Sequence, residues 1–197
     1  LELMFESEYD PEYDRIEQSE EADLPFLQDL CDKAGLRLKV SSDRVIIFDD
    51  EKYDAAPSVA TIMRGKSDII SYSFSSSTRK IYSSARVEYE PSDDEDEIEY
   101  TYTPPWAPKT GRTLIINERV TSLAEAERLC RRKLRKANAS ENRAEIILLG
   151  DLTLVAGINV SLAGFGKFDG KYAIETATHS GPAYETKVEL RRTLEGY

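Results

Sequence analysis

The C-terminal part of the chain consists of short apolar runs that are separated by glycine-containing turns at close intervals. The runs are Ala144–Leu149, Leu152–Val155, Gly157–Leu162, Lys171–His179 and Ala183–Leu194, and the turns contain Gly150, Gly164, Gly170 and Gly181. Strands joined this closely require tight turns, and glycine adopts the positive φ angles that such turns use. This pattern constrains the fold most, because it predicts a small antiparallel β-barrel or sandwich.

Charge and composition exclude several classes of protein. The 197 residues include 37 Asp and Glu against 26 Lys and Arg, a formal net charge of −11 that would repel nucleic acid on average. A hydrophobic content of 40% is too high for a disordered chain. No apolar run approaches the roughly 20 residues that span a bilayer, and the acidic start is unlike a signal peptide. Because the chain opens on Leu1 and not on Met, we expect a piece of a longer protein.

The N-terminal part predicts a mixture of helix and strand. Alternation over Leu1–Phe5 is typical of a half-exposed strand. A helix is expected from Asp23, as its N-cap, to Gly35, as a left-handed C-cap. Leu36–Val40 and Arg44–Phe48 then read as a hairpin, and Ser67–Glu90 alternates with period two, which indicates further strands.

A proline-rich stretch, 103–108, marks the expected division of the chain. It predicts a mixed α/β sub-domain over 1–105 and a second part over 106–197, which contains one amphipathic helix at 118–139. The acidic stretch Pro91–Glu99, which contains the run Asp93–Glu97, lacks the glycine turn and ligand spacing of a calcium loop, so we expect an exposed, mobile protrusion there.

The expected helix at 118–139 begins with a capping box of Ser122 and Glu125. Its apolar stripe consists of Leu123, Ala126, Leu129, Cys130, Leu134 and Ala137, and its basic face of Arg128, Arg131, Arg132, Lys133, Arg135 and Lys136. The basic face could bind nucleic acid, but no aromatic residues alternate with it to stack on bases. A solvated, charged helix face is the preferred interpretation.

No set of residues predicts catalysis, a cofactor or a metal. His179 is the only histidine, and no nucleophile motif accompanies it. Cys31 and Cys130 lie on apolar helix faces, so buried, reduced thiols are expected in preference to a disulfide or a zinc site. The glycines at 164–170 precede a strand and not a helix, which favours a turn over a phosphate loop. We expect His179 and Tyr184 to form a cross-strand pair, and Gly150 and Gly157 to permit turns.

Two blocks of the chain resemble a known family. The first is Gln18-Ser-Glu-Glu-Ala-Asp23 with Phe26-Leu27, Leu30 and Gly35. The second runs from Ser122-Leu-Ala-Glu-Ala126 through Gly150-Asp151, Gly157 and Asp169-Gly170-Lys171-Tyr172-Ala173-Ile174 to His179, Tyr184-Glu-Thr186 and Leu194-Glu-Gly-Tyr197. In order and spacing they are similar to the phage late control D proteins, the baseplate hub proteins of contractile tails.

That resemblance implies a mainly β, α+β fold of two small hub-type barrels with insertions. This chain would hold the insertion sub-domain at 1–105 and the second barrel at 106–197. It also implies a non-enzymatic virion protein of the tail or baseplate that links the tail tube to the central spike. Such a protein, of a phage, prophage or related contractile injection system, would assemble in the bacterial host cytoplasm and form a homotrimer at full length.

Three further expectations accompany this interpretation. Alternating charges at Glu175, Glu185, Lys187, Glu189 and Arg191 would discourage edge pairing, so this chain alone is expected to be monomeric. The alternative function is a carbohydrate- or small-ligand-binding β-domain, with Trp106 and tyrosines as a stacking surface. A hydrolase with a cleft of paired carboxylates ranks third.

Overall fold

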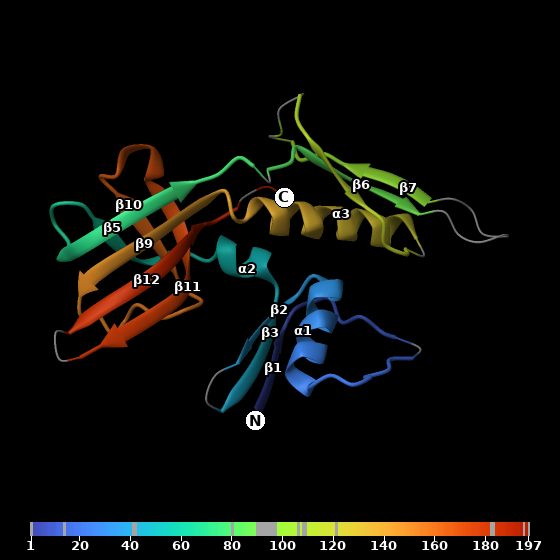
Figure 1. The fold of residues 1–197 in the computed structure, drawn as a ribbon, viewed down its shortest axis with the longest axis horizontal. Helices are drawn as coiled ribbons and strands as arrows, with labels where there is room; N and C mark the ends of the chain where they lie inside the picture. The colour runs from blue at the N-terminus through green and yellow to red at the C-terminus, as the bar shows by residue number, and fades with distance from the viewer. Residues whose placement is uncertain are drawn as a thin grey trace. The chain divides into compact units, whose positions relative to one another are not determined.

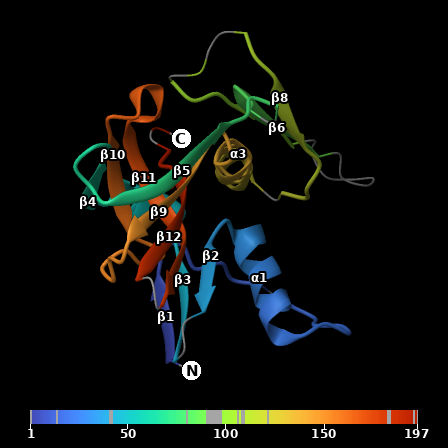
Figure 2. The same cartoon turned by 60° about the vertical axis from the view of Figure 1, so that its left-hand side comes forward.

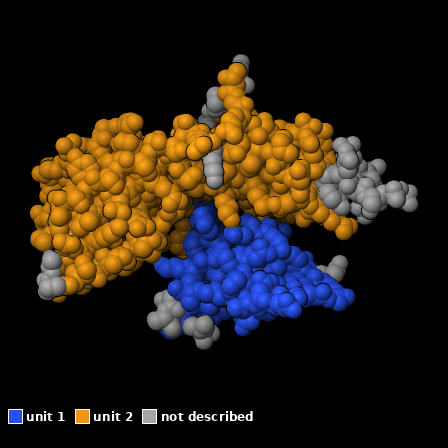
Figure 3. All heavy atoms as spheres, in the orientation of Figure 1, with its two compact units in different colours: residues 1–52 blue, residues 53–197 orange. Residues whose placement is uncertain are grey.

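The computed structural model describes residues 2–13, 15–40, 43–79, 81–89, 98–105, 107, 110–120, 122–181, 184–194 and 196. The acidic run Asp93–Glu97 and Trp106 lie outside the described residues. The chain forms two compact units, residues 1–52 and residues 53–197 (Figure 3). The unit boundary differs from the expected division at 105/106, because strands within 58–76 pair with strands near the C-terminus.

The first unit is a small sheet with one helix. Its strands β1 (Glu2–Glu6), β2 (Arg37–Val40) and β3 (Arg44–Phe48) have the order β1-β3-β2, with β1 parallel and β2 antiparallel to β3. Helix α1 (Asp23–Ala34) ends at Gly35, whose φ of 71° confirms the expected left-handed cap. Its N-cap is Ala22, so Asp23 is the first helical residue and not the cap. The core consists of Cys31, Ala34, Leu36 and Ile47. Helix α2 (Asp50–Ala55) follows.

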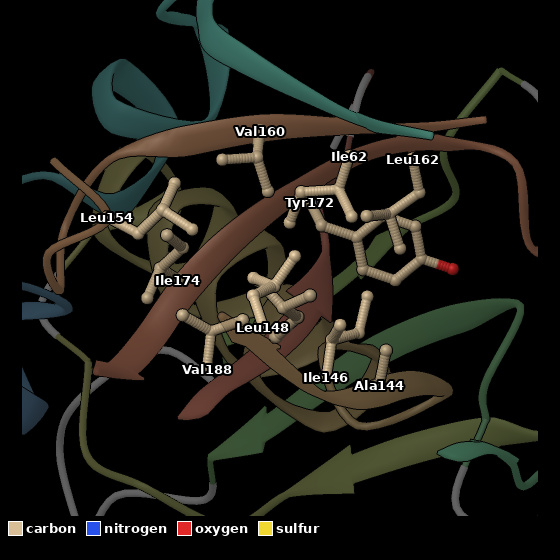
Figure 4. Packing of buried hydrophobic residues seen from close by; sticks show 11 residues of the cluster. Ile62, Ala144, Ile146, Leu148, Leu154, Val160, Leu162, Tyr172, Ile174 and Val188 are labelled. Atoms are coloured by element: carbon tan, nitrogen blue, oxygen red, sulfur yellow. The ribbon is translucent and has the colours of Figure 1, made fainter. Parts of the chain in front are cut away.

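The larger unit contains a six-stranded sheet, most of which can be followed in Figure 1. Its strands are β4 (Ser58–Met63), β5 (Ile69–Ser76), β9 (Asn142–Leu149), β10 (Asn159–Ala163), β11 (Gly170–Ser180) and β12 (Glu185–Arg192), in the order β4-β10-β11-β12-β9-β5. Only the β4–β10 pair is parallel. Apolar side chains of alternate positions meet on one face of this sheet (Figure 4), among them Ile62, Ile146, Val160, Tyr172 and Val188.

The two end strands of this sheet meet at a single corner. The turn Arg64–Asp68 joins β4 directly to β5. The Arg64 N–H donates to the carbonyl of Ala163, the last residue of β10, and the Asp68 carbonyl accepts from the N–H of Leu149, the last residue of β9. Aromatic side chains from both sides pack beside it, with Phe74 stacked on Phe168 at 4.5 Å between ring centroids. No backbone pairing of β4 with β5 occurs in the described part of the chain, so the expected closed barrel is not confirmed.

Three strands and a long helix complete the larger unit. Strands β6 (Ser84–Tyr89), β7 (Ile98–Tyr102) and β8 (Thr113–Ile116) form a sheet of order β7-β6-β8. Helix α3 (Leu123–Asn138) lies against it in both views (Figures 1 and 2). The expected Ser122 cap is confirmed, since its hydroxyl accepts from the Glu125 N–H, but Leu123 is 60% exposed and not part of the core. The β10–β11 connection contains only the 3₁₀ turn Gly166–Phe168. The fold is therefore mixed α/β and mainly β, as expected.

The strands that carry alternating charge are not edge strands. Both β11 and β12 lie inside the six-stranded sheet, so charges at Glu175 or Glu189 cannot protect an edge. The edges are β4 and β5, and neither contains a charged residue. The sequence pattern could not show this, because the sheet order depends on pairings between distant parts of the chain.

Candidate functional site

Arg135 and Arg191 belong to a buried ionic cluster and not to a solvated surface. Both donate to Oδ2 of Asp54, from Arg191 at 2.9 Å, and the Leu194 N–H donates to the same oxygen at 3.1 Å. Only 1% of the Asp54 side chain is exposed. The expectation of a fully solvated basic helix face is therefore wrong for Arg135. The cluster ties α2, α3 and β12 together, which gives it a structural role.

The outer face of the six-stranded sheet has a shallow hollow of about 230 Å³ in which three glutamates gather. Each of them pairs with a cation: Glu145 and Glu189 with Lys187, and Glu175 with Arg143 and Arg191. Carboxylates that are neutralised in this way are poor candidates for general acid–base chemistry. The described residues contain no group of His, Cys, Asp and Glu that could hold a metal ion.

The strongest candidate for a binding surface is a second hollow, of about 270 Å³, at the end of the six-stranded sheet. Strands β11 and β12 and the connections that follow β9 and β11 form it. Its described lining comprises Gly150, Leu152, His179, Ser180, Gly181, Tyr184, Glu185 and Thr186. We call this the end hollow. It brings Gly150, which the sequence pattern singled out as a turn residue, together with His179 and Tyr184, which it singled out as a pair.

Thr186 fixes the floor of the end hollow. Its buried hydroxyl donates to the carbonyl oxygen of Asp151 at 3.2 Å and accepts from the Asp151 N–H at 2.9 Å. Nδ1 of His179 lies 3.1 Å from the same hydroxyl. The imidazole of His179 is thus held by a hydrogen bond with Thr186.

Tyr184 lies at the rim in an unusual backbone conformation. Its φ is +52°, one of two positive values among the described non-glycine residues, and its side chain is 68% exposed. The Gly150 N–H donates to its carbonyl, and a Cβ on Gly150 would lie only 2.7 Å from that oxygen. Gly150 is therefore required for this close approach, whereas Gly157 has the positive φ, 92°, that a turn demands.

The expected pairing of His179 with Tyr184 is wrong in register. His179 is opposite Thr186, and Ser180 is opposite Glu185, so Tyr184 lies beyond the last pair. The two side chains share a hollow without being cross-strand partners. A positive φ at a non-glycine residue leaves no reliable mark in a single sequence, which is why the pattern misplaced Tyr184.

The tyrosines do not form an open stacking surface in the described structure. Tyr172 is fully buried, and guanidinium groups cover the rings of three others: Arg64 over Tyr72, Arg112 over Tyr82 and Arg131 over Tyr102. This arrangement does not favour the carbohydrate-binding alternative. Both cysteines are buried and free, as expected. Among the described residues, no helix has the length and apolar character to cross a membrane.

The solved structures to which this chain is similar include tail proteins of prophages. The 43 kDa tail protein of prophage MuSo2 from Shewanella oneidensis matches 98% of this chain with a TM-score of 0.76 and 14% identity. The tail protein from Neisseria meningitidis MC58 matches 97% with a TM-score of 0.70 and 15% identity. Prophage tail protein gp18 from Listeria monocytogenes EGD-e matches 86% with a TM-score of 0.58 and 16% identity.

The expected resemblance to tail proteins is therefore confirmed at the level of the fold. The chain spans 61% of the length of the Shewanella and Neisseria proteins and 52% of the Listeria protein. No protein-family model matches the chain, and no curated protein matches it in sequence.

Proposed function

We propose that this chain is a structural, non-enzymatic part of a phage tail or a related injection machine. The observation that carries the proposal is the fold match over 97–98% of the chain to two tail proteins. In its finer form, the chain is the C-terminal portion of a baseplate hub that links the tail tube to the central spike. It would assemble in the bacterial host cytoplasm and reside in the virion tail.

The edges of the six-stranded sheet support a role in assembly. Unpaired strands normally carry charges that prevent association with other chains. Strands β4 and β5 have none, although 32% of the whole chain is charged. Edges of this kind are suited to contacts between copies, as a homotrimer of the full-length protein would require.

Particle composition tests the proposed function. We would tag the chain in the organism that encodes it, induce particle production, purify tail-like particles on a density gradient and label them with gold. We expect label at one end of the tail. Particles that lack the tag, while the tagged protein is stable in the cell, would contradict the proposal.

Oligomeric state tests the finer form. Light scattering should give a trimer for the full-length protein and a monomer for residues 1–197 in dilute solution. This chain would hold only the second of the two barrels whose contacts alternate in the trimer, and its net charge of −11 opposes self-association. Ser73→Lys, at the β5 edge, should abolish the full-length trimer, whereas Lys39→Ser in β2 should not. A monomeric full-length protein would remove the hub interpretation.

A further inference from the structure

The end hollow presents two large apolar side chains to solvent. Leu152 is 67% exposed and Tyr184 is 68% exposed, and both line the same hollow. Single exposed apolar residues are common on protein surfaces, but two that flank a concave site are typical of interaction surfaces. Tyrosine is among the residues that contribute most to binding at such sites.

The backbone conformation of Tyr184 favours glycine over tyrosine at this position. A non-glycine residue at a φ of +52° is less stable than glycine by about 1–2 kcal/mol. Glycine would therefore suit the fold better, since a ring that is two-thirds exposed contributes little to the core. The hydrogen bond from Gly150 nevertheless holds this residue in place at the rim. What the tyrosine adds is a large, rigid, partly apolar surface.

Charge determines what can occupy the end hollow. Glu185 lies in its wall, and no ion pair of Glu185 occurs within the described ranges. Asp151 is adjacent: the hydroxyl and then the backbone N–H of Thr153 donate to it and lower the pKa of its carboxyl, so it stays ionised. The described lining contains no lysine or arginine. In the outer-face hollow, by contrast, every glutamate already has a cation.

We propose that the end hollow is a docking site for a different protein, one that inserts an apolar side chain flanked by lysine or arginine. Glu185 and Asp151 would pair with those cations, while Leu152 and Tyr184 enclose the apolar side chain. A second copy of this chain is disfavoured, because it would bring the same carboxylates and a net charge of −11 to the contact. The proposal rests on the proposed function in that it takes this partner to be another tail component.

The test is a titration of the purified chain, followed by backbone amide NMR. The ligand is a short blocked peptide with one leucine between two lysines, and its control has glutamates in place of the lysines. We expect the lysine peptide to shift the amides of Gly150, Leu152, Gly181 and Thr186 saturably, and the glutamate peptide to leave them unchanged.

Two variants separate binding from stability. Tyr184→Gly should weaken binding at least about fivefold without lowering Tm, because it relieves the backbone strain. Glu20→Gly is the matched control, since Glu20 is the other non-glycine residue with a positive φ, 54°, and it lies outside the end hollow. It should leave binding unchanged.

Several results would overturn the proposal. One is amide shifts that lie only outside the end hollow, and another is equal shifts with the lysine and glutamate peptides. A third is equal peptide binding by the Tyr184→Gly and Glu20→Gly variants. The same amide shifts on concentrating the chain without peptide would identify a second copy as the occupant. If the peptide titration fails, the result of the particle-incorporation experiment still stands. Absence of the chain from particles would instead refute the proposed function, whatever the titration gives.

Discussion

Two ionic clusters of the larger unit use the same chemistry in opposite surroundings. At the cluster of Asp54, Arg135 and Arg191, the side chains are 1%, 10% and 6% exposed. At the outer face, Lys187 is 41% exposed and its partners Glu145 and Glu189 are 44% and 51% exposed. Water can replace a lost partner at the second cluster, but it cannot reach the first. The same type of contact should therefore differ greatly in its effect on stability.

The largest effect is expected for Asp54→Ala. This change removes the carboxylate that the two buried guanidinium groups share and leaves Arg191 with Glu175 and Arg135 with the Leu194 carbonyl. Breaking a buried pair by removing one partner costs about 3–5 kcal/mol. For a chain of this size, Tm should fall by about 10 °C. Calorimetry and urea unfolding measure it, with Asp54→Asn as the matched control, which keeps the shape and one acceptor. A loss of less than about 1 kcal/mol in the alanine variant would remove the contrast between the clusters.

The origin of that loss can be tested by removing all three charges together. In a variant with Asp54→Leu, Arg135→Met and Arg191→Met, no charge remains buried, so stability should return most of the way to the parent. If this variant is as unstable as Asp54→Ala, the attraction between the Asp54 carboxylate and the two guanidinium groups itself stabilises the fold.

Thiol reactivity shows how far the buried cluster stabilises α3. Cys130 lies on the same helix as Arg135, is fully buried, and burial raises the pKa of its thiol. Burial, and then Asp32, likewise raise the pKa of Cys31. Both thiols should react with a disulfide reagent at least about tenfold more slowly in the native than in the unfolded chain. Asp54→Ala should accelerate Cys130 but not Cys31, and equal acceleration of both would indicate global unfolding.

Loss of the exposed cluster should have a small effect. Lys187→Ala removes its cation, but Glu145 and Glu189 remain hydrated, so we expect Tm to change by less than about 2 °C. High salt should reduce this difference further. A fall as large as that of Asp54→Ala would mean that exposure does not distinguish the two clusters.

The smallest effect is expected at Asp151, where Thr153 lowers the carboxyl pKa. Because the carboxyl pKa is lower in the folded chain than its ordinary value of 3.8, the ionised carboxylate stabilises the fold at pH values above 3.8. That stabilisation is lost as the pH falls through the lowered folded-state pKa. Thr153→Ala removes the hydroxyl donor, so the fall in Tm between pH 6 and pH 3 should shrink by about 1 °C. An increased fall in Tm would contradict this sign.

Local patterns predicted the elements well. Period-two alternation identified β5 and β6, Gly35 the end of α1 and Ser122 the start of α3. The expected strand at Leu152–Val155 is wrong, because the chain forms turns there, and β4 was not expected. Long-range order was not predictable: β4 and β5 give no sign in the sequence that they pair with β10 and β9. The expected division at 105/106 depended on a proline-rich stretch. Strands on either side of that stretch pair with each other, and the local sequence does not indicate such pairing.

Among the residues of the candidate sites, too, some roles could be predicted from local sequence patterns and others depended on tertiary contacts. The buried state of Cys31 and Cys130 followed from helix periodicity, because each lies on an apolar stripe. The role of Arg135 did not, because its neighbours Arg131 and Lys136 are the same type of residue and only the tertiary position of Asp54 distinguishes it. For Tyr184, the backbone conformation depends on the absence of a side chain at Gly150, which no spacing rule relates to it.

The strand order has a consequence for how the chain reaches its native state. Thr61 pairs with Ser161, which lies 100 residues further along the chain. Asp54 accepts a hydrogen bond from Leu194, which lies 140 residues further along than Asp54. Topologies dominated by such distant pairs fold slowly. During synthesis, the uncharged strands β4 and β5 must wait until β9 to β12 have left the ribosome. In that interval they are uncharged segments without their sheet partners, a state in which chains are prone to aggregate.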